Sequence, residues 1–161
     1  MILTLSYTYD SFYADCKELS EMEAVTIAQM PKEQGFISQD VNPVLGAMEE
    51  RDTTFLKDKL KFYAAEFYLA IRGWLDTDTP LTIDDTGIEF LFKDNAVSEA
   101  NAPIITQMVE KALQYGALAQ WYSRFFNRQD ISEKYGKSYE ALKSNARSIL
   151  IQKVERPYRF H

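Results

Sequence analysis

The chain has 161 residues, of which 46% are hydrophobic and 14% aromatic, and its formal net charge is −6. Its length and hydrophobic content are those of one globular domain, so we expect residues 1–161 to form a single domain. The net negative charge disfavours general nucleic-acid binding, because non-specific affinity for phosphate requires a basic surface. Cys16 is the only cysteine, which excludes an intramolecular disulfide and a cysteine-based zinc site.

The sequence contains no cationic segment followed by an apolar run at its start, and no stretch apolar enough for a membrane span. We therefore expect a protein that is cytoplasmic where it is synthesised. The first predicted element is a strand over residues 2–9, because apolar and polar residues alternate there. Asp10 or Ser11 can cap a short helix that runs to about Leu19. Residues 20–48 contain two prolines and two glycines, so we interpret them as an irregular connection with short helical or extended pieces.

A long amphipathic helix is predicted over residues 52–74, with Asp52 as its N-cap and Gly73 near its end. Its apolar residues recur at alternating spacings of four and three, which places them on one helix face. We expect this face to pack in a core, since such stripes rarely form cofactor sites. The stripe consists of Leu56, Leu60, Tyr63, Phe67, Ala70 and Trp74.

A β-hairpin is predicted near residues 81–92, where two alternating runs surround a turn. Asp84 and Asp85 are favourable turn residues, and Gly87 can adopt the left-handed conformation that closes a three-residue loop. An isolated hairpin is marginally stable. We therefore expect it to join the N-terminal strand or to pack on the helices; alternatively, it protrudes as an arm that contacts a neighbouring subunit.

Two further long helices are predicted in the C-terminal third. The first begins at Asn101, with Pro103 in its first turn. Residues 127–129 then break the run, and Asp130 with Glu133 forms a capping box that opens the second helix. The apolar stripes are Ile105, Met108, Ala112, Tyr115, Ala119, Tyr122 and Phe126 in the first helix and Tyr135, Tyr139, Leu142, Ala146 and Ile149 in the second. The short break predicts antiparallel packing, and the fold is expected to be mainly α, a small antiparallel bundle of three long helices with a minor β element.

Residues able to carry out chemistry are few. His161 is the only histidine and is the last residue of the sequence given, which is a poor position for a catalyst or a metal ligand. The common nucleotide-binding, zinc-protease and serine-hydrolase motifs do not occur. We therefore predict a non-enzymatic protein with no catalytic, cofactor-binding or metal-binding residue. The weakest alternative is an enzyme built on the scattered carboxylates Glu66, Glu110 and Glu140, which lack the Glu-x-x-His elements of helical metal sites.

Residues 155–161 are predicted to form an extended tail, because Pro157 ends the last helix. The tail alternates cations and aromatic rings, which suits an extended segment on a protein partner that carries carboxylates and apolar pockets. A frayed terminus that orders only on assembly is compatible with this role. The predicted partner-binding residues are Arg156, Pro157, Tyr158, Arg159 and Phe160.

Residues 52–161 resemble the head-tail connector proteins of tailed bacteriophages, also called adaptor or neck proteins. The resemblance rests on residues 118–126, LAQWYSRFF, followed by residues 133–142, EKYGKSYEAL. It implies a virion or prophage structural protein that assembles into a ring of identical copies and docks its C-terminal tail on the portal or on neighbouring neck or tail proteins. The N-terminal strand and residues 20–48 depart from the compact form of the family. The alternative function is a helical ligand-binding or regulatory domain with an aromatic-lined pocket.

Overall fold

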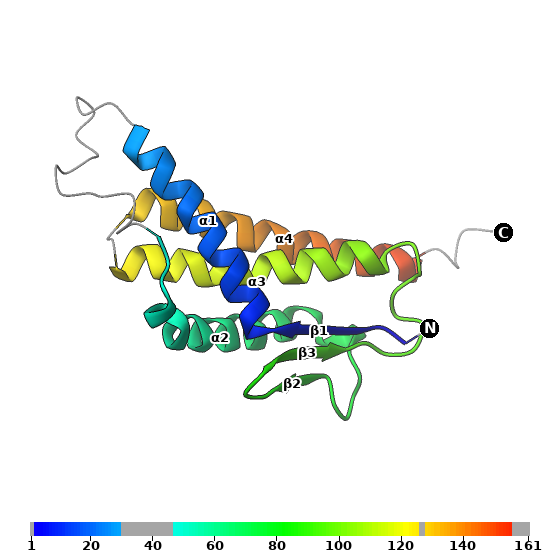
Figure 1. Ribbon diagram of the computed structural model, residues 1–161. Coiled ribbons are helices and arrows are strands. Elements are labelled where there is room, and N and C mark those ends of the chain that lie inside the picture. Colours follow the sequence, from blue (N-terminus) through cyan, green and yellow to red (C-terminus); the bar gives the residue numbers. More distant parts are fainter. Residues whose placement is uncertain (1, 30–46, 126–127, 156–161) are drawn as a thin grey trace.

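The computed structural model describes residues 2–29, 47–125 and 128–155, which form four α-helices and a small antiparallel sheet (Figure 1). The prediction of a mainly α fold with a minor β element is therefore confirmed. None of the helices in these ranges combines the length and the apolar character needed to cross a membrane. The elements are β1 (Thr4–Thr8), α1 (Tyr9–Gln29), α2 (Thr53–Ile71), β2 (Leu81–Ile83), β3 (Gly87–Leu91), α3 (Ala102–Phe125) and α4 (Gln129–Glu155).

Helix α1 is a continuous helix of 21 residues, longer than the sequence predicts. The prediction of a helix ending near Leu19 is wrong, and so is the irregular interpretation of residues 20–29. Residues 30–46 lie outside the described part of the chain. The helix continues because residues 20–29 contain neither proline nor glycine, and its buried face repeats every fourth residue through Cys16, Ser20 and Ala24. Because Ser20 is polar, this buried face does not form a continuous apolar pattern in the sequence.

Helix α2 confirms the predicted long helix but begins one residue later. Asp52 does not cap it with its side chain; Asp52 instead closes a 3-10 turn, where its Oδ2 accepts the backbone N–H of Glu49 at 2.8 Å. A second 3-10 turn, Arg72–Trp74, follows α2, so the helix itself ends at Ile71. Its buried set contains Ala64 and Ile71, whereas the predicted Ala70 and Trp74 are half-buried and pack against the core.

The hairpin joins the N-terminal strand in a three-stranded sheet of order β1-β3-β2. In this register Leu5 lies opposite Phe90, and Tyr7 lies opposite Ile88. These four side chains are buried. The sheet packs on the helices through Phe90, whose ring centroid lies 6.3 Å from that of Phe67 on α2. The prediction that the hairpin completes a sheet with the N-terminal strand is confirmed.

The hairpin turn confirms the prediction that Asp84 is a turn residue. It does not confirm the left-handed conformation that was predicted for Gly87. The Oδ1 atom of Asp84 accepts hydrogen bonds from the backbone N–H groups of Thr86 and Gly87, at 2.8 and 2.9 Å, and from the Thr86 hydroxyl. These bonds hold the pKa of Asp84 below its usual range. Gly87 is a strand residue without a left-handed backbone; glycine is required there because a Cβ atom would lie 2.0 Å from the carbonyl oxygen of Tyr7.

Helix α3 lies at the centre of the fold and is buried along most of its length. The helix begins at Ala102, one residue after the predicted start, and the N–H of Ile105 donates to the carbonyl of Asn101. Small residues permit close packing: a Cβ atom on Gly116 would lie 2.7 Å from the ring of Tyr63 on α2. Helix α4 returns antiparallel beside α3, as predicted (Figure 1).

The predicted capping box at the start of α4 is not formed. The helix begins at Gln129, so Asp130 already lies in its first turn. The carboxylate of Asp130 accepts hydrogen bonds from Nε and Nη2 of Arg128 at 3.1 and 3.0 Å, and this pairing holds the pKa of Asp130 below its ordinary value. The carboxylate of Asp130 is therefore used in an ion pair with Arg128, two residues earlier, and not in the reciprocal bonds that were expected with Glu133.

Candidate functional site

The three scattered carboxylates do not converge on one site. Glu66 on α2 and Glu140 on α4 both form an ion pair with Lys143, and a carboxylate oxygen of each lies 3.2 Å from its Nζ. Glu110 lies elsewhere, at the contact between α1 and α3, where Gln114 joins it to Asp15. Among the described residues, no three or more His, Cys, Asp or Glu side chains gather in a way that could hold a metal ion.

Asp15 and Glu110 form a pair of carboxyl groups bridged by the buried amide of Gln114. The Nε2 of Gln114 donates to Oδ2 of Asp15 at 2.7 Å and to Oε1 of Glu110 at 3.4 Å. Burial raises the pKa of Glu110, and the hydrogen bond and charge of Asp15 raise it further against the opposing charge of Lys111. The raised pKa favours the protonated form of Glu110, and the Gln114 amide ties α1 to α3 through its hydrogen bond to Asp15.

Cys16, next to this pair, is buried, and its burial and the charge of Asp15 raise the pKa of the thiol to about 12. A thiol that remains protonated at neutral pH is a poor nucleophile. In the core a buried thiol of this kind behaves as a small apolar residue.

Replacing Glu110 with glutamine is expected to stabilise the fold at pH 7. The pKa of Glu110 is raised in the folded chain, so its contribution to stability is complete below its unfolded pKa of about 4.3 and is lost as the pH rises through the folded value. The neutral Glu110→Gln side chain avoids that loss. Thermal unfolding at pH 7 and pH 4 should show a higher Tm for the variant at pH 7 and convergence at pH 4.

The matched control for that measurement is Glu18→Gln, which neutralises an exposed carboxylate on α1. It should leave the pH dependence of the Tm nearly unchanged. A Glu110→Gln variant less stable than the native chain at pH 7 would show that the charged form is the one that the fold prefers.

Tyrosine hydroxyls form several of the hydrogen bonds between the helices. Lys134 and the hydroxyl of Tyr135 both donate to Oε1 of Glu23, the latter at 3.0 Å, which ties α4 to α1. The hydroxyl of Tyr139 donates to Oε1 of Glu66 at 2.8 Å, which ties α4 to α2. The aromatic content is therefore explained in large part by a core in which rings pack and hydroxyls bind carboxylates.

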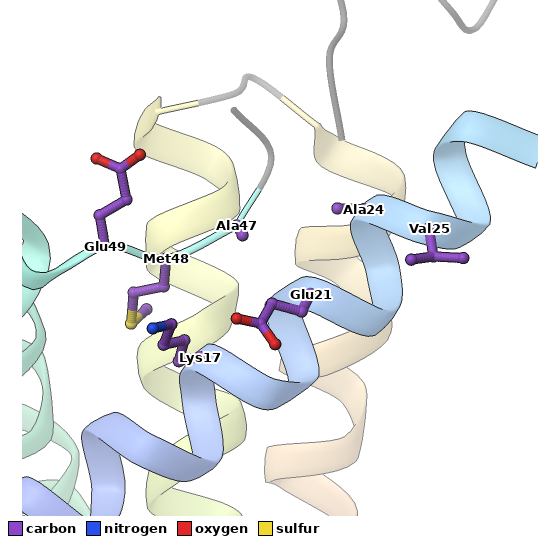
Figure 2. Close-up of a pocket in the computed structure, with 7 residues that line it drawn as sticks. All are labelled: Lys17, Glu21, Ala24, Val25, Ala47, Met48 and Glu49. Carbon is purple, nitrogen blue, oxygen red and sulfur yellow. The ribbon is translucent and has the colours of Figure 1, made fainter. Parts of the chain in front are cut away.

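An open groove of about 330 Å³ lies between α1 and residues 47–49 (Figure 2). The facing segment is anchored by Ser20, whose Oγ accepts the N–H of Met48 at 2.7 Å and donates to the carbonyl of Lys17. Figure 2 shows Lys17 and Glu21 extending from α1 towards Met48 on the opposite side. The groove combines apolar walls with charged groups at its margins. It is lined by Lys17, Glu21, Ala24, Val25, Ala47, Met48 and Glu49.

An aromatic–cation cluster lies where the start of α2 meets the end of α3. The rings of Phe55 and Phe125 meet edge to face at 5.0 Å between centroids. The guanidinium carbon of Arg124 lies 5.8 and 5.9 Å from the two ring centroids, and Nζ of Lys59 lies 5.4 Å from that of Phe55. Phe125 is 49% exposed, and Arg124 is also exposed. Exposed aromatic rings combined with arginine are typical of the residues that dominate protein–protein binding.

The predicted partner-binding residues Arg156, Pro157, Tyr158, Arg159 and Phe160 lie outside the described residues. The end of α4 that precedes them is described, and Figure 1 shows it at the end of the bundle opposite the α3–α4 turn. The aromatic–cation cluster lies at the turn end. Sequence analysis identified Arg124 and Phe125 as part of the 118–126 segment but did not pair them with Phe55, because only the tertiary packing of α2 on α3 brings these residues together.

Comparison of the chain with models of protein families, with curated proteins and with solved structures gives no match. The geometry and chemistry of its own residues are therefore the basis for inferring a function. Those residues include an exposed aromatic–cation cluster and an apolar groove with charged margins, both suited to contact with other proteins.

Proposed function

We propose that this chain is a non-enzymatic assembly protein, a head-tail connector subunit of a tailed bacteriophage or prophage. In this role it assembles into a ring of identical copies and docks its C-terminal tail on a portal-like partner. The observation that carries the proposal is the aromatic–cation cluster of Phe55, Lys59, Arg124 and Phe125. A solvated bundle gains little from keeping a half-exposed Phe125 beside Arg124, whereas a protein interface uses this pairing for affinity.

The arrangement of the two ends of the bundle also favours a bridging component. The cluster lies at the α3–α4 turn, and α4 runs from that turn to the opposite end before residues 156–160. A connector must contact one neighbour on each side. A tail at one end and an aromatic–cation surface at the other would meet that requirement.

Charge supports the same assignment. Arg156 and Arg159 give the tail two cations among aromatic residues, which suits a partner surface with carboxylates and apolar pockets. The whole chain carries a net charge of −6. An acidic surface suits a conduit through which DNA must slide, because it does not retain phosphate.

The ligand-binding alternative has weaker support. It requires a pocket lined by aromatic rings, whereas the groove beside α1 is lined by aliphatic and charged residues. Tyr63, Tyr135 and Tyr139 are buried between helices. The described residues therefore favour an interaction protein.

Deleting residues 156–161 is expected to leave the helical circular dichroism nearly unchanged and to abolish assembly with the portal-like partner. Phe125→Ser should weaken the contact at the other end by at least about fivefold, since removing a central aromatic contact commonly costs more than about 1 kcal/mol. Light scattering of the full chain, alone and mixed with the products of its neighbouring genes, measures both effects. The matched control is Ile104→Ser, which changes a residue 45% exposed at the opposite end of α3.

Retained assembly in the truncated chain would contradict the role of the tail. A large fall in thermal stability on truncation would show instead that the tail belongs to the core. Equal effects of Phe125→Ser and Ile104→Ser would contradict the role of the aromatic–cation cluster.

A further inference from the structure

Helix α2, together with Arg72 at the start of the 3-10 turn that follows it, carries a second regular stripe on the face that points away from the core. Its members recur at spacings of four and three, and all five are exposed. Phe62 is 56% exposed and Leu69 is 60% exposed, which are high values for large apolar side chains in the middle of a helix. This stripe, the α2 seam, consists of Asp58, Phe62, Ala65, Leu69 and Arg72.

The α2 seam is separate from the buried stripe that holds α2 in the fold. Leu60 and Phe67 on the buried face are fully covered. Figure 1 shows α3 and α4 on one side of α2, and the exposure of the seam indicates that neither these helices nor the sheet covers it. Two apolar stripes on one helix indicate two packing surfaces, of which one is occupied within the chain.

The residues of the seam are arranged so that the seam of one copy is complementary to the same seam of a second copy that runs in the opposite direction. Ala65 lies at the centre of the seam. Asp58 and Arg72 lie at its two ends, equally far from Ala65 along the chain, and Phe62 and Leu69 lie between the centre and the ends. If a second copy lies antiparallel across a twofold axis at Ala65, Asp58 of each copy faces Arg72 of the other. Phe62 lies three residues before Ala65 and Leu69 four residues after it, so Phe62 of each copy packs beside Leu69 of the other, offset by one residue. A contact related by a twofold axis requires this self-complementarity.

We propose that two copies of this chain pair through their α2 helices, antiparallel and centred on Ala65. The small Ala65 side chain allows the helix axes to approach to about 8–10 Å, and Phe62 and Leu69 then bury their exposed surface on each other. Within the described ranges Asp58 and Arg72 form no ion pair, so both are available for the partner copy. The antiparallel orientation also places the helix dipoles favourably.

This pairing goes beyond the proposed connector function and does not depend on it. A ring is built from contacts that join different surfaces of neighbouring copies, whereas the α2 contact joins the same surface of two copies. The pairing also does not use the tail or Phe125. Loss of pairing and loss of connector assembly are therefore separable in experiments on the same protein.

The test is sedimentation equilibrium of the full chain over a wide concentration range, combined with a charge exchange. The native chain is expected to form a dimer. Asp58→Arg alone should raise the dissociation constant at least tenfold, because it places two cations opposite each other in each half of the contact. The double variant Asp58→Arg with Arg72→Asp should return the dissociation constant to the native value, since the two charges of each ion pair are exchanged and the pair is kept. Leu69→Ser should also raise the dissociation constant at least tenfold.

Cross-linking gives the geometry independently of affinity. Ala65→Cys in the full chain should form an intermolecular disulfide under mild oxidation, because the twofold axis brings the two substituted positions together. The control is Ala141→Cys, an exposed site on α4. A monomer at every concentration would overturn the proposal. So would a dimer that is insensitive to the charge exchange, or equal cross-linking at positions 65 and 141.

Discussion

Replacing Trp121 with alanine should lower the free energy of unfolding by about 3–5 kcal/mol, the usual cost of truncating a fully buried aromatic residue. Trp121 is 2% exposed and lies on α3, the helix on which the other helices pack. Its ring meets that of Tyr122 at 4.9 Å and 76°. A cavity at this position removes contacts within the closely packed core, where the surrounding side chains have little room to collapse into it.

Trp74→Ala provides the matched control, since it makes the same substitution at the only other tryptophan. Trp74 is half-buried in the 3-10 turn after α2, so its replacement should cost roughly 1–2 kcal/mol. Urea unfolding followed by circular dichroism measures both variants without relying on tryptophan fluorescence. Equal losses for the two variants would contradict the difference in burial between these positions.

The long helices were predictable because their apolar residues repeat with the period of a helix. Most of the predicted stripe on α2 is buried, and the hairpin pairs with the N-terminal strand as expected. The second half of α1 was not predictable by the same method. Its buried face contains Ser20, whose hydroxyl oxygen accepts a hydrogen bond from the backbone N–H of Met48. A search for apolar residues at helical spacing does not detect a polar residue that is buried with its hydrogen bond formed.

Much less of the candidate site was predictable. The 118–126 segment drew attention to Arg124 and Phe125, but their partner Phe55 is distant in sequence. The hydroxyls of Tyr135 and Tyr139 bind Glu23 and Glu66 inside the bundle, and these carboxylates are also distant in sequence. Pairings between distant residues follow from how the helices pack, and one sequence read by local periodicity does not contain them.

The two faces of α2 show why burial must be known before an exposed pattern has meaning. Phe62 and Leu69 lie two turns apart, a spacing that the core also uses. From the sequence alone they are additional apolar residues on an amphipathic helix. Once Leu60 and Phe67 are known to fill the core, the exposed pair requires another explanation, and Asp58 and Arg72 then suggest a second copy.

Replacing Gly87 with alanine should cost at least about 3 kcal/mol, at the upper end of the range for overpacked sites. The added Cβ atom would lie 2.0 Å from the carbonyl oxygen of Tyr7 and 3.2 Å from Cα of Thr8. These are backbone atoms of β1, so no side chain can rotate to relieve the overlap. The strands must separate locally, which weakens the pairing of Tyr7 with Ile88 and uncovers part of the inner face of the sheet.

Gly136→Ala is the control for this effect, because nothing lies within 4 Å of the added Cβ atom. Gly136 lies inside α4, where alanine should increase stability by about 0.5–1 kcal/mol. The same substitution is therefore expected to have opposite signs at the two sites, measured by urea unfolding. If Gly87→Ala were as stable as the native chain, β1 could not lie against β3 in this register, and the position of the N-terminal strand would have to be revised.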